Sequence, residues 1–524
     1  MPSISRDQFN LTKCFKTSKS KEKSTSFRKN LSSCFTEFSN NTGIQGFKYL
    51  GETGRSSFEK IFWLIVLCIS LYICVSLIKL TWRKWDENPV FISFSQTPKH
   101  VWDIPFPAVT ICPQVKIKSK IFNFTYYYDA LRYDDHNLTA EEVKNYADSQ
   151  LPCFGYPKVI YIKHTTDEET VRRIIQNAPT LNETIPYCTW AHVRRKCDTI
   201  FTPILTSSGV CFTFNMLDKN EIFTNITYIG KDHVNNEKTL RWTVDNNYIR
   251  TKEDVYPRRA KSAINRQSLK VNLYSDKEDV ALRKCNIQAG FRIMLHHPAE
   301  SPRKSTRDLQ LLFDNYDILI KPEITTTSSD LINYAPHRRK CYFSHERQLK
   351  FFKIYTEENC QTECLANYTL SECHCAPYYM PREKSTRICG INEFWCVEYA
   401  EERLLDQVME SQVSDDRNKS MSCDCLPSCT SIIYNSEVSR INFNVKTSTT
   451  HSSNRIFFKD NKFISMERNE LFGDTDFWAN CGGLFGLFTG FSVMSFIEII
   501  YFLSMRWMCN RFAAKSQPAS ADAE

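Results

Sequence analysis

The sequence lacks the motifs of the common hydrolases. No Gly-x-Ser-x-Gly elbow occurs outside the apolar segments, and His345-Glu346 is not followed by the second histidine of a zinc protease. No internal repeat is visible either. These absences argue against a membrane-bound ectoenzyme. We therefore expect no enzymatic activity, no cofactor, no bound metal and no nucleic-acid partner.

Charge is absent from one long stretch and nearly absent from another. Residues 61–78 carry no charge, and residues 478–505 carry only Glu498. A helix of about 20 apolar residues crosses a bilayer, and the first stretch lies too deep in the chain for a signal-peptide core. We predict two membrane spans, at 61–80 and 478–505.

Cysteine is scarce outside the segment between these spans. Sixteen of the 22 cysteines lie in it, as expected for disulfides in an oxidising compartment. The first sixty residues carry eleven Lys or Arg against five Asp or Glu, which favours the cytoplasmic side, although three basic residues just beyond the first span oppose this orientation. We predict cytoplasmic tails at 1–60 and 506–524 and an extracellular domain at 81–477. Six N-glycosylation sequons lie in this domain, at Asn123, Asn137, Asn182, Asn225, Asn367 and Asn418.

Apolar alternation in the extracellular segment predicts strands at 90–112, 158–163 and 210–215. Pro105 and Pro107 mark a break or an edge. Residues 235–310 are highly charged and low in cysteine, so we predict a solvated, mostly exposed region there.

Residues 341–429 hold ten cysteines. Apolar residues at helical spacing between Phe394 and Val408 predict a helix, and Cys360 and Cys364 lie on one face of another. We interpret the segment as two helices held by disulfides. A zinc module is the alternative, but the C-x-C pairs do not match the usual zinc spacing. The cysteines alone leave the pairing open.

The second apolar stretch is unusual for a simple anchor. Gly482, Gly486 and Gly490 are four residues apart and share one helical stripe, which allows close helix approach in lipid. An acid such as Glu498 in a membrane usually faces a partner or a water-filled path. The pattern favours a span that meets copies of itself around a polar pathway.

Three segments resemble the degenerin / epithelial sodium channel superfamily. GGLFGLFTGFSVMSFIE at 482–498 resembles its second span, and FPAVTIC at 106–112 resembles the segment after its first. Residues 339–382 look most like the insect pickpocket branch. The resemblance implies an α+β membrane protein with two transmembrane helices, a β-strand palm core and a disulfide-braced helical thumb at 341–429. It also implies a homo- or heterotrimer with related subunits.

The resemblance further implies a set of disulfides. The implied pairs are Cys112–Cys211, Cys188–Cys197, Cys341–Cys429, Cys360–Cys425, Cys364–Cys423, Cys373–Cys396 and Cys375–Cys389. Cys153 and Cys285 are left over, and we predict that they pair with each other.

In this family the Gly-x-Ser triplet, here Gly490-Phe491-Ser492, forms the ion-selective ring. On a continuous helix Gly490 and Ser492 would point about 200° apart, so both can face one axis only if the helix breaks. Irregular backbone at membrane depth is tolerated where it lines an aqueous cavity, and its carbonyls can replace part of a cation's water shell. Glu498 then attracts cations on the inner side; an ion pair with Arg506 is the alternative.

The resemblance also places gating residues. Ala479 occupies the position where a small residue keeps gating normal, and Gly482, Gly483 and Gly486 complete a close-packed approach. The family's His-Gly pair before the first span is here Gln45-Gly46, within a gating segment at 43–50. The glycine can still make a re-entrant turn.

The resemblance implies a plasma-membrane channel subunit that conducts sodium and other monovalent cations and is blocked by amiloride, in sensory or epithelial cells. The alternative is a modulatory, non-conducting subunit or a ligand-sensing receptor. ATP-gated trimeric channels share the two-span topology but not the glycine-rich second span or this cysteine pattern. The gating stimulus stays open, and the histidines give only mild support for acid gating.

Overall fold

The computed structural model describes residues 36–506, except 53, 88, 134–137, 154–159, 161, 164, 229–238, 240–241, 246, 249–254, 264, 282–284, 286–288, 306, 414–422 and 442–449. The chain divides into two compact units. The first combines the residues up to Phe91 with those from Glu470 onward, and the second spans Ile92–Asn469.

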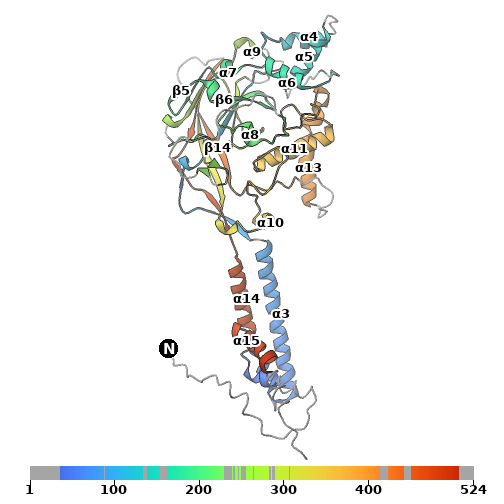
Figure 1. The fold of residues 1–524 in the computed structure, drawn as a ribbon, viewed down its shortest axis with the longest axis vertical. Coiled ribbons are helices and arrows are strands. Elements are labelled where there is room, and N and C mark those ends of the chain that lie inside the picture. The colour runs from blue at the N-terminus through green and yellow to red at the C-terminus, as the bar shows by residue number, and fades with distance from the viewer. Residues whose placement is uncertain are drawn as a thin grey trace, which may run out of the picture. The chain divides into compact units, whose positions relative to one another are not determined.

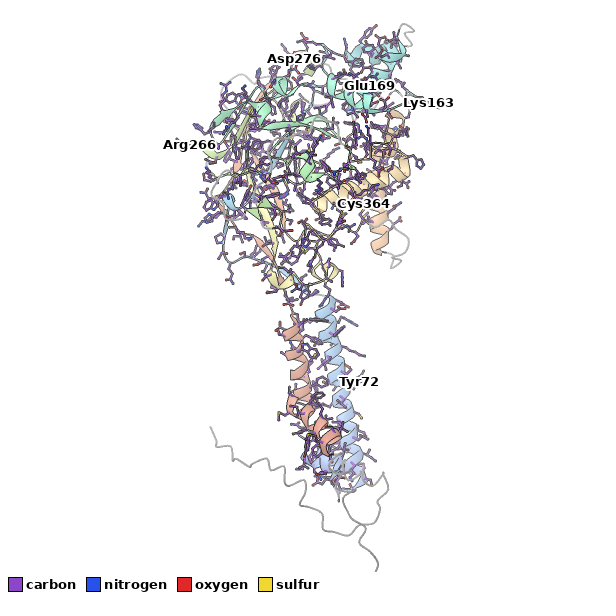
Figure 2. The ribbon with its side chains drawn as sticks, viewed as in Figure 1. Tyr72, Lys163, Glu169, Arg266, Asp276 and Cys364 are labelled. Carbon is purple, nitrogen blue, oxygen red and sulfur yellow. A yellow bond between two sulfur atoms is a disulfide. The ribbon has the colours of Figure 1, made fainter. Side chains whose placement is uncertain are left out.

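The first unit is helical, and its longest element is α3 (Ser57–Glu87, 31 residues). Its apolar side chains are mostly exposed; Tyr72, which projects from the helix in Figure 2, is 75% exposed. Such a surface suits contact with lipid rather than water. Of the described helices, α3 alone is long and apolar enough to cross a membrane by itself. It contains the first predicted span.

The second predicted span is not one continuous helix. It is divided into α14 (Asp474–Thr489) and α15 (Val493–Tyr501), and a π-helical turn, Phe502–Arg506, follows. The two helical segments meet at 70° and pass the length and hydropathy test only when taken together. α3 and α14 lie side by side (Figure 1), with the rings of Trp82 and Trp85 5.6 and 5.4 Å from that of Phe477.

The second unit contains two main β-sheets. The eight-stranded sheet has the order β1-β17-β13-β15-β10-β4-β5, with β14 paired to β13. Its strands are β1 (Val90–Phe94), β4 (Tyr187–Trp190), β5 (Val193–Arg195), β10 (Leu269–Tyr274), β13 (Asn315–Thr327), β14 (Ser431–Arg440), β15 (His451–Phe458) and β17 (Met466–Glu470). The five-stranded sheet has the order β12-β11-β3-β7-β6. Its strands are β3 (Ala108–Pro113), β6 (Phe201–Thr206), β7 (Gly209–Phe214), β11 (Phe291–His296) and β12 (Leu309–Leu311).

One hydrophobic core joins residues of both sheets. Leu269 and Val271 of β10 and Ile456 of β15 contact this core together with Ile111 of β3 and Phe291 of β11. All five are fully buried. The prediction that residues 235–310 are mostly exposed is therefore wrong for β10 and β11. The strand prediction at 158–163 is also wrong for its described residues, Ile160, Ile162 and Lys163, which are not in a strand.

The longer helices of this unit lie on one side of the sheets, on the right in Figure 1. The longer ones are α4 (Phe124–Arg132), α5 (Ala140–Gln150), α6 (Glu168–Asn177), α11 (Glu357–Cys373) and α13 (Ala400–Val413), with the short α10 (Pro336–Arg339) and α12 (Phe394–Glu398). α11 begins where the Thr356 side chain accepts a hydrogen bond from the Asn359 N–H, which satisfies one of the free amides of the first turn.

Eight disulfides brace the second unit, and their pairs are those stated above. They are Cys112–Cys211, Cys153–Cys285, Cys188–Cys197, Cys341–Cys429, Cys360–Cys425, Cys364–Cys423, Cys373–Cys396 and Cys375–Cys389. Cys364 lies on α11 (Figure 2), and Cys373–Cys396 joins the end of α11 to α12. No group of three or more potential metal ligands occurs among the described residues.

Candidate functional site

The candidate site is the helix break at residues 490–492 in the first unit. α14 ends at Gly490, whose φ of 65° and ψ of 14° are left-handed, a conformation that is costly for residues with a Cβ. α15 begins after Ser492, which is extended and whose hydroxyl accepts a hydrogen bond from the Ser495 N–H at 3.3 Å. The departure from helix inferred from the Gly-x-Ser spacing is present in the structure.

The break changes which backbone carbonyls are occupied. The Phe488 carbonyl accepts a hydrogen bond from the Ser70 hydroxyl at 2.6 Å, and the Thr489 carbonyl accepts one from the Gln45 N–H at 2.9 Å. The next two carbonyls, of Gly490 and Phe491, accept no hydrogen bond from the described part of the chain. An oxygen without a donor is available to water or to a cation.

The segment before α2 (Phe47–Gly51) lies directly against the break. A Cβ on Gly490 would come within 2.9 Å of Gln45 Cγ and 3.3 Å of the Gly43 carbonyl oxygen. Gly46 turns the chain into α2 with a φ of 90°. The absence of a side chain at Gly490 therefore serves both the left-handed turn and this close approach.

Glu498 lies on α15, close to the same segment. Its Oε2 accepts a hydrogen bond from the Gly43 N–H at 3.2 Å, and the side chain is half-buried. The described contact therefore ties the acid to the N-terminal segment. The side chain of Arg506, the alternative partner, lies outside the described residues.

The proposed gating residues form an exposed stripe on α14. Ala479, Gly482, Gly483 and Gly486 are all exposed, and their spacing places them on one helical face. A Cβ on Gly482 or Gly483 would meet no atom of the described residues within 4 Å beyond its own stretch of α14. Packing against the described residues therefore does not explain why these two positions are glycine.

The ring of Phe491, a residue of the break, packs against α14. Its centroid lies 6.0 Å from that of Phe485, and the residue is half-buried. The side chain therefore has a neighbour on α14, whereas the carbonyl of the same residue has no hydrogen-bond donor among the described residues.

The predicted glycosylation sites differ in exposure. Asn123, Asn182 and Asn225 are exposed. Asn367 is half-buried within α11, and the Thr369 of its sequon is fully buried. The remaining two, Asn137 and Asn418, lie outside the described residues.

The family model described as "Amiloride-sensitive sodium channel" matches residues 38–502, which is most of the 524-residue chain and includes both helical segments of the site. The chain belongs to this family. Family members are ion channels of the plasma membrane, assembled from several related subunits, and they are not enzymes.

Several curated relatives of this amiloride-sensitive sodium channel family member come from Drosophila melanogaster. Pickpocket protein 28 is 27% identical, with 90% of this chain and 78% of the relative covered. Sodium channel protein Nach is 21% identical, with 90% of this chain and 87% of the relative covered. Acid-sensing ion channel 4-B of Danio rerio is more distant, at 21% identity over 89% of this chain and 75% of its own length. The family assignment from the sequence is confirmed.

Part of the site could not be anticipated from the sequence. The Gln45-Gly46 pair and the gating segment at 43–50 were predicted, but not the hydrogen bonds that the Gly43 and Gln45 amides donate to Glu498 and Thr489, and not the contribution of Ser495. The Gly43-x-x-Gly46 spacing was the only local signal for this segment. Ser495 stands three residues after Ser492, a spacing typical of reciprocal capping.

Proposed function

We propose that this chain is a subunit of a trimeric, sodium-conducting channel, and that α14 and α15 together form its second membrane span. The observation that carries the proposal is the left-handed break at Gly490, where the carbonyls of Gly490 and Phe491 have no hydrogen-bond donor among the described residues. Non-helical backbone in a span is tolerated where it lines a water-filled path. We infer that these carbonyls and the Ser492 hydroxyl form the ion-selective ring.

The trimer is supported by the exposed stripe from Ala479 to Gly486. Small residues at this spacing allow helices to approach closely in a membrane. All four are exposed, and a Cβ on Gly482 or Gly483 would meet nothing in the described chain beyond α14 itself. Neighbouring copies, or related subunits, would cover them in the assembly. A bulky residue at Ala479 would then hold the helices apart and keep the pore open.

The proposed topology follows from charge and cysteine. The basic N-terminal tail favours the cytoplasm, and the eight disulfides favour an extracellular second unit. Glu498 would lie toward the cytoplasmic end of the pathway and raise the local cation concentration. Amiloride, itself a cation, would block at the outer mouth. Sensory or epithelial cells are the expected tissue.

The test is a current recording from cells that express the chain with and without Ala479→Val. We expect the substitution to produce a constitutive inward current that amiloride blocks and that falls when sodium is replaced by potassium. Phe477→Leu, at a buried position outside the stripe, is the control and should produce no constitutive current. Equal sodium and potassium currents would refute selectivity.

A modulatory, non-conducting subunit is the second candidate. Gln45 favours this modulatory role. It stands where the family has histidine, and it lies directly against the break, because its N–H donates to the Thr489 carbonyl. No current from Ala479→Val alone, followed by current on co-expression with a related subunit, would support this role over that of a homomeric channel.

A further inference from the structure

A cavity of about 110 Å³ lies in the second unit, where three segments far apart in the sequence meet. Its walls come from the end of β3 and the residues after it, from α7 (Leu181–Thr184), and from the end of β10 with α9 (Lys277–Ala281). Both α7 and α9 are near the top of this unit in Figure 1. The cavity has room for about eight water molecules, and therefore for a ligand of similar size.

Side chains of both charges line the cavity. They are Lys118 and Lys120 together with Glu183, Asp276 and Asp279, of which Asp276 is labelled in Figure 2. Lys118 Nζ lies 3.1 Å from the Glu183 carboxylate, and Lys120 Nζ lies 2.9 Å from that of Asp276. An ammonium group can donate three hydrogen bonds, so these ion pairs leave each lysine with capacity for a further acceptor.

One lysine and one acid of the wall are much more buried than the other charged groups. The Lys118 side chain is 17% exposed, against 68% for Lys120. Asp279 is 7% exposed, and the other two acids are more exposed. Charges interact more strongly where water is excluded. Lys118 and Asp279 therefore dominate the electrostatics of the cavity.

The wall also contains a buried hydroxyl group. Thr184, at the end of α7, is 1% exposed, and its Oγ1 atom has no hydrogen-bond partner within the described part of the chain. The Asp279 carboxylate is held in place, because its Oδ1 accepts hydrogen bonds from the N–H and the hydroxyl of Ser119 at 2.8 and 2.6 Å. A buried polar group without a partner destabilises a fold, so we expect a polar occupant in the cavity.

The mixed charge of the walls decides the class of ligand. A metal ion or another simple cation would lie beside two lysines, and a simple anion would lie beside three carboxylates. The described residues also contain no group of three or more potential metal ligands. A molecule with one ammonium group and one carboxylate group meets an opposite charge for each of them.

We propose that this cavity binds a small zwitterionic amino acid. Its carboxylate would accept hydrogen bonds from Lys118 and from the Thr184 hydroxyl, and its ammonium group would donate to Asp279. A short side chain would contact the apolar part of the wall, which includes Val115 and Pro179. The cavity belongs to the second unit and the helix break to the first, so the proposal does not depend on whether the chain conducts sodium.

The test measures thermal unfolding of the purified full chain with L-alanine, ethylamine or propionate, each at about 10 mM and at equal pH and ionic strength. Ethylamine is alanine without the carboxylate, and propionate is alanine without the ammonium group. A ligand that binds only the folded state stabilises it by mass action. We expect alanine to raise the melting temperature by about 2 °C and the two analogues to leave it unchanged. No rise with alanine, as for a cavity that holds only water, or an equal rise with either analogue would overturn the proposal.

Two variants remove single contacts of the proposed site. Asp279→Asn keeps an oxygen for the Ser119 donors and removes the charge, and Thr184→Val keeps the shape and removes the hydroxyl. Both should abolish the rise with alanine. Thr184→Val should not lower the melting temperature without alanine, because the hydroxyl that it removes has no partner among the described residues.

Thr362→Val is the matched control for these variants. The buried Thr362 hydroxyl likewise has no partner among the described residues, but it does not line the cavity. This control should keep the full alanine effect. Loss of the effect in Thr362→Val, or its persistence in Asp279→Asn, would contradict the site. If a variant does not fold, the comparison of alanine with its two analogues on the unaltered chain still decides.

Discussion

Replacing Gly490 by alanine should disrupt the break more than the addition of one methyl group suggests. The left-handed conformation of Gly490 costs a residue with a Cβ about 1–2 kcal/mol. The new Cβ would also lie 2.9 Å from Gln45 Cγ, and moving that side chain off its preferred rotamer adds about 1 kcal/mol. A total of about 2–3 kcal/mol lowers the population of the native break about 30- to 150-fold.

Sodium and potassium currents, normalised to the amount of protein at the cell surface, measure this effect. We expect Gly490→Ala to lose current and selectivity together. Gly43→Ala is the matched control in the same contact, because its Cβ would meet only Ser495 Oγ at an ordinary 3.5 Å. Adding Gln45→Ala to Gly490→Ala should recover the steric part of the loss and leave the backbone part. Unchanged selectivity in Gly490→Ala would refute the reasoning.

Three further predictions concern the second unit. Burial, and then the charge of Glu358, raise the pKa of Glu300 to about 8. The protonated carboxyl group stabilises the fold fully below about pH 4.5, and this contribution is lost as the pH rises through 8. Glu300→Gln should therefore flatten the pH dependence of thermal unfolding between pH 5 and 8.5. The fully buried Asn359 bonds to two backbone carbonyls and one N–H, so Asn359→Ala should cost about 2–4 kcal/mol in denaturant unfolding, and a loss below 1 kcal/mol would contradict this. Asn367 should carry no glycan, because Thr369 is fully buried with its hydroxyl bonded within α11, and glycopeptide mass spectrometry that finds Asn367 occupied would show this to be wrong.

The break at Gly490 could be predicted because the family resemblance implies that Gly490 and Ser492 face one axis. They cannot do so on an unbroken helix, so the resemblance and local geometry together were sufficient. The contact of Gln45 with Thr489 could not be found in this way, because it joins segments more than 400 residues apart. The small residues of α14 were visible in the sequence, but only the structure shows that the described part of the chain leaves Gly482 and Gly483 uncovered.

The error at residues 235–310 has a plain physical reason. The high charge of this segment predicted exposure, but the alternation of residues along a strand decides which side chains are buried. In β10, buried Leu269, Val271 and Leu273 alternate with the more exposed Lys270 and Asn272. A strand with one buried face can carry many polar residues on the other. Seven of the disulfide pairs, by contrast, followed from the family resemblance, because ten cysteines in one segment permit too many combinations to choose between. The eighth, Cys153–Cys285, was predicted because these two cysteines were left over.

The nested disulfides of the thumb also set an order in time. Cys341, Cys360 and Cys364 pair with Cys429, Cys425 and Cys423, so the first three to be synthesised wait for the last three. The 88-residue separation of the outermost pair corresponds to about 4–18 s of synthesis at about 5–20 residues per second. During that interval Cys373, Cys375, Cys389 and Cys396 are already available as wrong partners. A ribosome that pauses before Cys423 would lengthen the time during which Cys341, Cys360 and Cys364 remain unpaired. Correct disulfide formation in residues 341–429 should therefore depend on the rate of translation and on disulfide isomerases.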